Sequence, residues 1–168
     1  HIASEFSAFA KLPDTRFEKV DIIQKINKSV SFYSTNTQAK IIVTNHADSN
    51  EIFVLGDKDQ LLRTFNNLIK NAIEAGLGRR KLKIDFDIYA NPNEMVEIHI
   101  TDNGNGISDE ALPKIFQANF TTKSSGTGLG LAFVKQTIEG MRGTIDFKTT
   151  AGKGTVFIIH IPFYHTMI

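Results

Sequence analysis

TDNGNGI (residues 101–107) and FQANFTTKSSGTGLGL (residues 116–131) are the two segments around which the rest of the chain is organised. The first follows an apolar strand pattern, Met95–Ile100, and its turn begins at Asp102. The second carries Lys123 and then three alternating glycines before an amphipathic run. A strand-end carboxylate can accept a hydrogen bond from a base amino group, and amides at a helix start favour phosphate oxygens. The two segments therefore predict a nucleotide held at both ends.

Neither glycine-rich segment is specific by itself. DNGNG is equally consistent with an ordinary turn at the end of a strand. GTGLG does not match a Walker A loop and does not follow a strand, as a Rossmann fingerprint would. A helix pattern upstream, from Gln60 to Ala75, places Asn67 and Asn71 one turn apart, so that they share a face. The three features together favour a nucleotide site over unrelated turns.

Five segments of the chain, in this order, resemble the N, G1, F, G2 and G3 boxes of the catalytic, ATP-binding domain of sensor histidine kinases. The resemblance extends from about Phe17 to Pro162, and NAIEA and NFTTKSSGTGLGLAFVKQTIE are most similar to the nitrogen-regulation type. The five segments are NLIKNA (residues 67–72), DNGNGI (102–107), KIFQANFTTK (114–123), GTGLGL (126–131) and GKGT (152–155).

Length and composition agree with one globular domain. The 168 residues are 41% hydrophobic, carry a formal net charge of +1 and include no cysteine. The lack of cysteine excludes disulfides and thiolate metal sites. The small net charge produces no strong electrostatic field that would attract the chain to nucleic acid or to a membrane surface. No apolar run approaches the roughly 20 residues of a membrane span. The first residue is His1 and not Met, so we expect a piece of a longer protein.

Periodicity predicts an α+β chain of helices and mostly antiparallel strands. Two β-rich runs, Ile41–Val43 and Ile52–Leu55, are expected to form a hairpin through residues 45–50. Asp57 or Asp59 is expected to cap the helix that carries the two asparagines. The other expected elements are helices at 21–36 and from Leu131 to Met141, and strands at 17–22, 82–89, 95–102, 144–148 and 155–161.

The resemblance implies a fold and a domain division. The fold would be the Bergerat fold of GHKL ATPases, a two-layer α/β sandwich with a mixed, mostly antiparallel sheet. Residues 108–125 would form a lid over the nucleotide, with Phe116 and Phe120 anchoring it to the body or packing against the dimerisation helices. Residues 1–13 would end a dimerisation helix and its linker, and residues 14–168 would form the catalytic domain.

The resemblance also implies which residues hold Mg²⁺ and the phosphates of ATP. Asn71 would be the magnesium ligand, and a neutral amide oxygen suits a hard cation whose charged ligands are phosphates. Asn67 would contact phosphate or metal-bound water, and Lys123 would offer its ammonium to the terminal phosphate. Asn67 and Lys123 are thus the expected catalytic residues. Further phosphate-side candidates are Lys70, Thr121, Thr122, Gly126, Thr127, Gly128, Leu129, Gly130 and Leu131. Lys70 is equally consistent with a solvated surface lysine.

The base would lie at the other end of the site. Asp102 would accept from the adenine amino group, and Gly104 and Gly106 would let the backbone pass close to the base. Thr155 matches the threonine of the G3 box and could join these hydrogen bonds. Candidates for the apolar walls are Ile73, Ile107, Leu131 and Phe157, although core packing is the favoured role for Ile73.

Two departures from the family pattern affect the expected chemistry. Many members carry Lys three residues after the second asparagine of the N box, where this chain has Glu74. No histidine carries the motif of a phosphoacceptor, so the acceptor is expected on a dimerisation domain absent from this chain. The expected partners are that domain, a response regulator and ATP or ADP. The full-length protein would be a homodimer, with this domain in the cytoplasm and any membrane anchor elsewhere.

Two rival readings remain. An ATPase of the gyrase, HSP90 and MutL branch would share the fold, but that branch has a general-base Glu where this chain has Asn67. A non-catalytic module that binds nucleotide or a partner protein is the other rival, and the intact glycine boxes and Asp102 oppose it.

Overall fold

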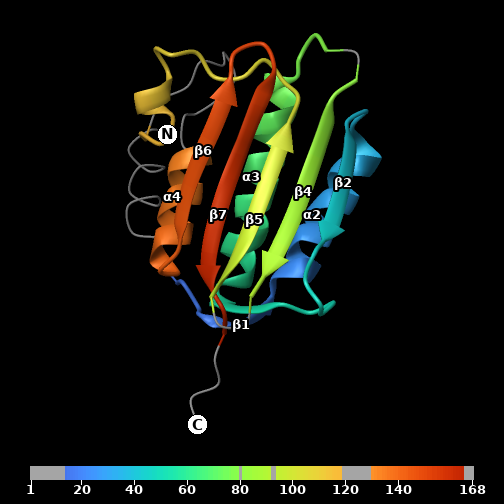
Figure 1. Cartoon of the computed structure of the whole chain (residues 1–168). Coiled ribbons are helices and arrows are strands. Elements are labelled where there is room, and N and C mark those ends of the chain that lie inside the picture. The colour runs from blue at the N-terminus through green and yellow to red at the C-terminus, as the bar shows by residue number, and fades with distance from the viewer. Residues whose placement is uncertain (1–13, 80, 92–93, 119–129, 165–168) are drawn as a thin grey trace.

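A five-stranded mixed sheet carries three helices on one face. The computed structural model describes residues 14–79, 81–91, 94–118 and 130–164. Figure 1 shows the sheet in front, in the order β2-β4-β5-β7-β6, with α2, α3 and α4 behind it. The elements are β1 Glu18–Asp21, α2 Ile22–Asn36, β2 Lys40–Asn45, β3 Phe53–Gly56, α3 Lys58–Ala75, β4 Lys83–Ala90, β5 Met95–Asp102, the short 3-10 helix η1 Leu112–Lys114, α4 Gly130–Gly140, β6 Thr144–Thr150 and β7 Gly154–Pro162.

The pairing confirms a mixed, mostly antiparallel sheet. Strand β2 runs parallel to β4, whereas the β4–β5, β5–β7 and β6–β7 pairs are antiparallel. The remaining strands, β1 and β3, form a separate two-stranded antiparallel sheet. The two-layer α+β architecture expected from the sequence is therefore confirmed.

The expected hairpin between residues 41–43 and 52–55 is wrong. Strand β2 lies beside β4, with Ile41 opposite Ile84, and β3 pairs with β1 instead. After β2 the side chain of Asn45 accepts from the Ala47 amide and donates to the Ser49 carbonyl, which turns the chain away from a return alongside β2. An apolar run indicates a strand but not its partner, and the nearest run in sequence was the wrong one.

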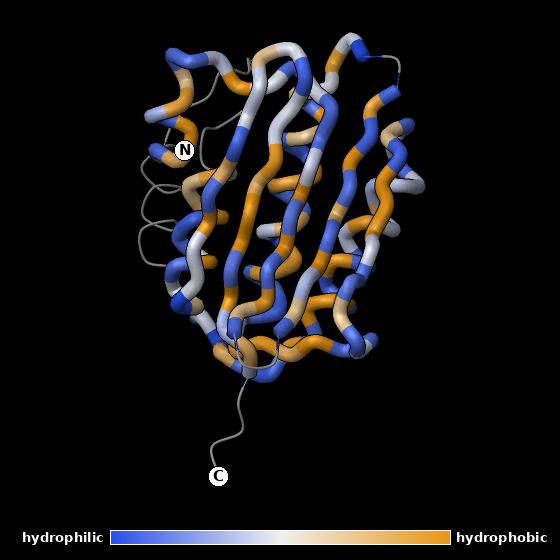
Figure 2. Tube along the Cα trace, in the orientation of Figure 1, coloured by the Kyte–Doolittle hydropathy of each residue, from blue (hydrophilic) through white to orange (hydrophobic). Residues whose placement is uncertain are grey.

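The core lies between the sheet and the helices. In β4 the residues Ile84, Phe86 and Ile88 are fully buried, and the charged residues between them face outward. The same period-two alternation runs along β5 and β7, and Figure 2 shows it as changing colours along each strand. The Phe65 ring on α3 packs against Phe86 with 6.3 Å between ring centroids, which joins the two layers.

Helix α3 is fixed at its beginning by Asp57. The Asp57 carboxylate accepts hydrogen bonds from the amides of Asp59 (2.9 Å) and Gln60 (3.0 Å), and also from Arg16 (2.9 Å). Burial favours a higher pKa for Asp57, but these backbone hydrogen bonds and the Arg16 charge lower its pKa below the ordinary value. Asp57, and not Asp59, is therefore the cap of α3.

Candidate functional site

A row of polar side chains crosses the inner face of the sheet at one end. Asp102 ends β5 opposite Thr155 of β7, and Thr155 lies opposite Thr149 of β6. Asp102 and Thr155 are polar, but each is only 5% exposed, and their neighbours on this face are apolar. The hydroxyls of Thr149 and Thr155 are 2.8 Å apart. A buried carboxylate and hydroxyl pair at the end of an apolar face is typical of a ligand site, because burying such groups is costly.

The loop that follows Asp102 is held between two other parts of the fold. The carboxylate accepts from the Gly104 amide at 2.8 Å, and the Asn105 amide donates to the carbonyl of Ala75 at the end of α3. On the other side the Gly152 amide donates to the Asn105 carbonyl at 2.8 Å. These contacts gather the end of β5, the end of α3 and the β6–β7 turn at the top of Figure 1.

Gly104 and Gly106 are required by this packing. A Cβ on Gly104 would lie 2.8 Å from the Ala75 carbonyl oxygen. Gly106 has a φ of +76° and its Cβ would lie 2.5 Å from the carbonyl oxygen of Thr150. The glycines therefore let the loop approach protein backbone on both sides, a reason that the sequence reasoning did not include.

Helix α3 presents the two asparagines along one half-buried face. The Asn67 side-chain amide donates to the carbonyl of Gly130 at 3.3 Å, where α4 begins. Asn71 is half-buried one turn further along, and Lys70 is exposed. The structure therefore brings Asn67 to the first residue of α4, directly after the second glycine-rich segment.

Part of the expected site lies outside the described residues. Residues 119–129 include Phe120 and the candidates Thr121, Thr122, Lys123, Gly126, Thr127, Gly128 and Leu129. The preceding residues, 112–118, are described, and Ile115 is buried against the core. Phe116 lies edge-on to Phe147 and Phe157, at centroid distances of 5.8 and 6.3 Å. Of the two roles expected for Phe116, this contact favours anchorage to the body of the domain.

The apolar candidates lie around the same end of the sheet. Ile73, Ile107 and Leu131 are half-buried and pack against the core, so each still presents some surface. Phe157 is only 2% exposed, which makes core packing its main role.

A family model for the histidine kinase-, DNA gyrase B- and HSP90-like ATPases matches residues 56–165, which include α3 and the whole polar row. The chain belongs to this ATPase family. The matched range begins just before the cap of α3 and ends beyond β7, so the described site lies entirely inside it.

Sensor histidine kinases are among the proteins that this ATPase domain resembles. The sensor histidine kinase ZraS of Salmonella typhimurium is 35% identical over 163 residues, which cover 96% of this chain and 34% of the relative. An NtrY-like sensor histidine kinase of Rickettsia conorii is 30% identical over 95% of this chain and 26% of its own length. The chain thus spans about a third or less of the curated relatives it matches.

A solved structure shows the same fold. The mycobacterial sensor histidine kinase MprB superposes with a TM-score of 0.75 at 25% identity, over 88% of this chain and 98% of that structure. The likeness to a sensor histidine kinase structure confirms the expected two-layer fold of the GHKL ATPases.

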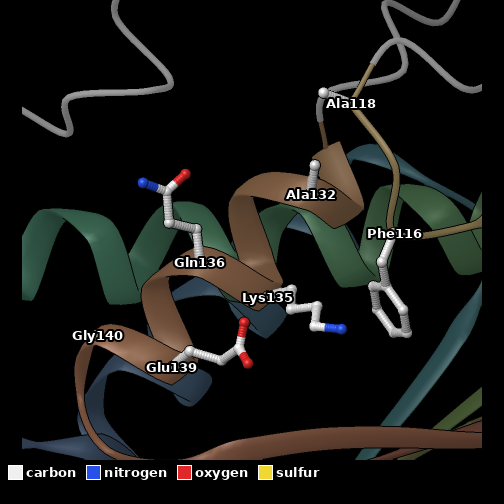
Figure 3. Close-up of a pocket in the computed structure, with 7 residues that line it drawn as sticks. All are labelled: Phe116, Ala118, Ala132, Lys135, Gln136, Glu139 and Gly140. Carbon is white, nitrogen blue, oxygen red and sulfur yellow. The ribbon is translucent and has the colours of Figure 1, made fainter.

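A shallow hollow of the ATPase domain lies beside α4 and does not contain the polar row. Its volume is about 440 Å³, and the Lys135 ammonium is 5.2 Å from the Phe116 ring centroid. Figure 3 shows Lys135 extending toward Phe116 and Gln136 pointing away from it. Neither Asp102 nor Asn71 is among the residues that line this hollow. Its lining residues are Phe116, Ala118, Ala132, Lys135, Gln136, Glu139 and Gly140.

Three histidines lie away from the polar row. His99 of β5 and His160 of β7 are on the outer face of the sheet, and His46 directly follows β2. Glu97 lies 2.6 Å from His160 and 3.2 Å from His99, and His46 lies 2.8 Å from Asp87. Burial favours a higher pKa for Glu97, but the hydrogen bond from His160 and the charges of both histidines lower it. These imidazoles are paired with carboxylates and face away from the polar row. His1 and His165 lie outside the described residues.

The sequence reasoning missed Thr149, although its signal was present. Thr149 is two residues after Phe147 and four after Ile145, so it shares their inward face on β6. A polar residue in phase with buried apolar ones, next to a glycine-rich turn, is unusual enough to single out.

The described part of the chain contains no helix that could span a membrane. Across residues 14–79, 81–91, 94–118 and 130–164, every helix is too short or too polar to span one.

Proposed function

We propose that this domain binds Mg²⁺-ATP along the polar row and α3, and that it delivers the γ-phosphoryl group to a histidine on a dimerisation domain. The buried Asp102 carboxylate, beside Thr155 at the end of the inner sheet face, is the observation that carries the proposal. Membership in an ATPase family supports nucleotide binding. The relatives named sensor histidine kinases support histidine as the acceptor.

The base-binding end fits adenine by its hydrogen-bonding chemistry. An ionised carboxylate only accepts hydrogen bonds, and the exocyclic amino group of adenine only donates them. The loop from Gly104 to Ile107, clamped between α3 and the β6–β7 turn, keeps Asp102 in place. Ile73, Ile107 and Leu131 supply apolar surface near it.

The phosphate end fits a magnesium ion held largely by the nucleotide. Within the described residues, no group of three or more His, Asp or Glu side chains could hold a metal ion. Mg²⁺ needs few protein ligands when phosphates and water complete its octahedron. We assign the protein ligand to Asn71, with Asn67 beside it and Lys70 within reach of a phosphate. When bound, Mg²⁺ neutralises phosphate charge.

We assign the remaining phosphate contacts to residues 121–131. Thr121, Thr122 and Lys123 would contact the terminal phosphate. The amides from Gly126 to Leu131 would face the phosphates at the start of α4. Lys123 would also neutralise the charge that develops during transfer.

The chain's own residues position the reactants rather than activate water. Phosphoryl transfer depends mainly on alignment and charge stabilisation. The side chain of Asn67 is an amide and cannot act as a general base, so it cannot activate water for ATP hydrolysis. Asn67 also ties α3 to α4 through Gly130, which keeps the two sides of the phosphate site together.

The proposal includes the organisation of the full protein. Residues 14–168 would be the catalytic domain, and residues 1–13 would connect it to a dimerisation helix. The full-length homodimer would pass the phosphoryl group from its histidine to a response regulator. The domain would act in the cytoplasm, and the proposal requires neither nucleic acid nor a membrane contact by this domain.

Equilibrium titration with a non-hydrolysable ATP analogue, with and without Mg²⁺, tests the binding half of the proposal. Binding that strengthens with Mg²⁺ is expected. Absence of binding under both conditions would favour the rival in which the chain only contacts a partner protein.

Asn71→Ala should remove most of the magnesium dependence while adenosine still binds. Losing one hydrogen-bonding or metal-ligating group costs on the order of 1–2 kcal/mol, so affinity for Mg²⁺-ATP should fall about tenfold. Calorimetry with adenosine, ATP and Mg²⁺-ATP measures this. Asn27→Ala on the exposed face of α2 is the matched control. Equal losses for adenosine and Mg²⁺-ATP would show that Asn71 does not act through the metal.

A further inference from the structure

Thr149 has three hydrogen-bonding neighbours that none of the expected roles explains. Its hydroxyl accepts from the Ile107 amide at 2.9 Å and donates to the Gly154 carbonyl at 3.1 Å. The hydroxyl of Thr155 lies 2.8 Å away. Thr149 therefore joins the loop after Asp102 to the β6–β7 turn and to the polar row.

The direction of the Thr149–Thr155 hydrogen bond follows from counting protons. A hydroxyl has one proton to donate and two lone pairs to accept with. Thr149 makes all three bonds only if its proton goes to the Gly154 carbonyl and its lone pairs accept from Ile107 and Thr155. Because partly buried polar groups are normally satisfied, this is the favoured arrangement. Thr155 must then donate its own proton to Thr149.

A Thr155 hydroxyl with its proton committed to Thr149 can only accept from any other neighbour. Thr155 lies beside Asp102 on the adjacent strand, and both side chains are buried on the inner face. The site then presents two hydrogen-bond acceptors, a carboxylate and a hydroxyl, to the edge of a base. Adenine offers an amino group to such a pair, whereas guanine offers a carbonyl oxygen at the same ring position.

We propose that Thr149 is a positioning residue that selects adenine over guanine nucleotides by fixing Thr155 as a hydrogen-bond acceptor. The inference rests on the proposed function, since it assumes that the base lies against Asp102 and Thr155. It adds that base selectivity depends on a residue that does not itself contact the base.

Binding of ADP and GDP to four forms of the chain tests the proposal: wild type, Thr149→Val, Thr149→Ser and Thr150→Val. Valine removes the acceptor and frees the Thr155 proton to face a guanine carbonyl. The ratio of ADP to GDP affinity should narrow about five- to tenfold in Thr149→Val. Thr149→Ser should restore the ratio, because serine keeps the hydroxyl. Thr150→Val changes an exposed threonine on the same strand and should leave the ratio unchanged.

The ratio distinguishes positioning from a general loss of structure. An unchanged ratio of ADP to GDP affinity in folded Thr149→Val would overturn the proposal, whether both affinities fall by the same factor or neither changes. Thermal melting establishes that each variant is folded, and Thr149→Ala replaces the valine variant if that one does not fold. A wild-type chain that binds neither ADP nor GDP would contradict the proposed function itself. This result differs from a shifted ratio of the two affinities.

Discussion

Asp102→Asn should weaken binding of ADP and ATP about tenfold or more, without unfolding the chain. The carboxylate uses Oδ1 to accept from the Gly104 amide at 2.8 Å. An asparagine can keep that bond with its own oxygen, so the loop should stay in place. Its amino group would then occupy the position of the second carboxylate oxygen, where in the proposed complex it would meet the adenine amino group. A buried mismatch of two donors costs roughly 1–3 kcal/mol.

Calorimetry with ADP on the folded variant measures this loss. Asp146→Asn is the matched control, because Asp146 is exposed on β6, away from the polar row. Equal ADP affinity in wild type and Asp102→Asn would remove Asp102 from the site.

Gly154→Ala should destabilise the domain by about 3 kcal/mol or more and abolish nucleotide binding. Gly154 has a φ of +137°, and a Cβ there would lie 2.0 Å from the Asp102 carbonyl oxygen. It would also lie 3.0 Å from the Cα of Asn103. Both contacts are to backbone, so relief requires β5 and β7 to separate where Asp102 and Thr155 pair.

Gly152→Ala is the matched control for this prediction. Gly152 also has a positive φ, +77°, but a Cβ there would meet nothing within 4 Å. Only the backbone strain of about 1–2 kcal/mol should remain. Denaturant unfolding of both variants separates the two effects. Equal destabilisation would show that the close approach to Asp102 is unimportant.

The local elements were predictable because periodicity reports burial directly. The alternation of apolar and charged residues in 82–89 predicted the strand β4, in which Ile84, Phe86 and Ile88 are fully buried. The helical pattern of α3 was equally predictable, but the sequence left its cap open between Asp57 and Asp59, and the structure shows Asp57. The partner of β2 was not predictable, since strand pairing depends on the whole sheet and neighbouring runs give no information on parallel crossovers.

Candidate site residues could be selected from the sequence, but the contacts between them could not. Asp102 and Asn67 could be chosen from boxes in the sequence, and the structure places both around one end of the fold. The contacts of Asn67 with Gly130 and of Thr149 with Ile107 join residues that are distant in the chain. The backbone reasons for Gly104 and Gly106 likewise appear only when α3 and the β6–β7 turn are packed against the loop.

Transfer of label from γ-labelled ATP to the dimerisation helices is the most direct test of the proposed function. The helices of the full-length protein are supplied as a separate polypeptide, and the chain is also incubated alone. We expect slow ATP hydrolysis and no stable label on the isolated chain, label on the helices when they are added, and less label with Lys123→Ala. Rapid ATP hydrolysis by the isolated chain, or stable label on one of its own histidines, would contradict it.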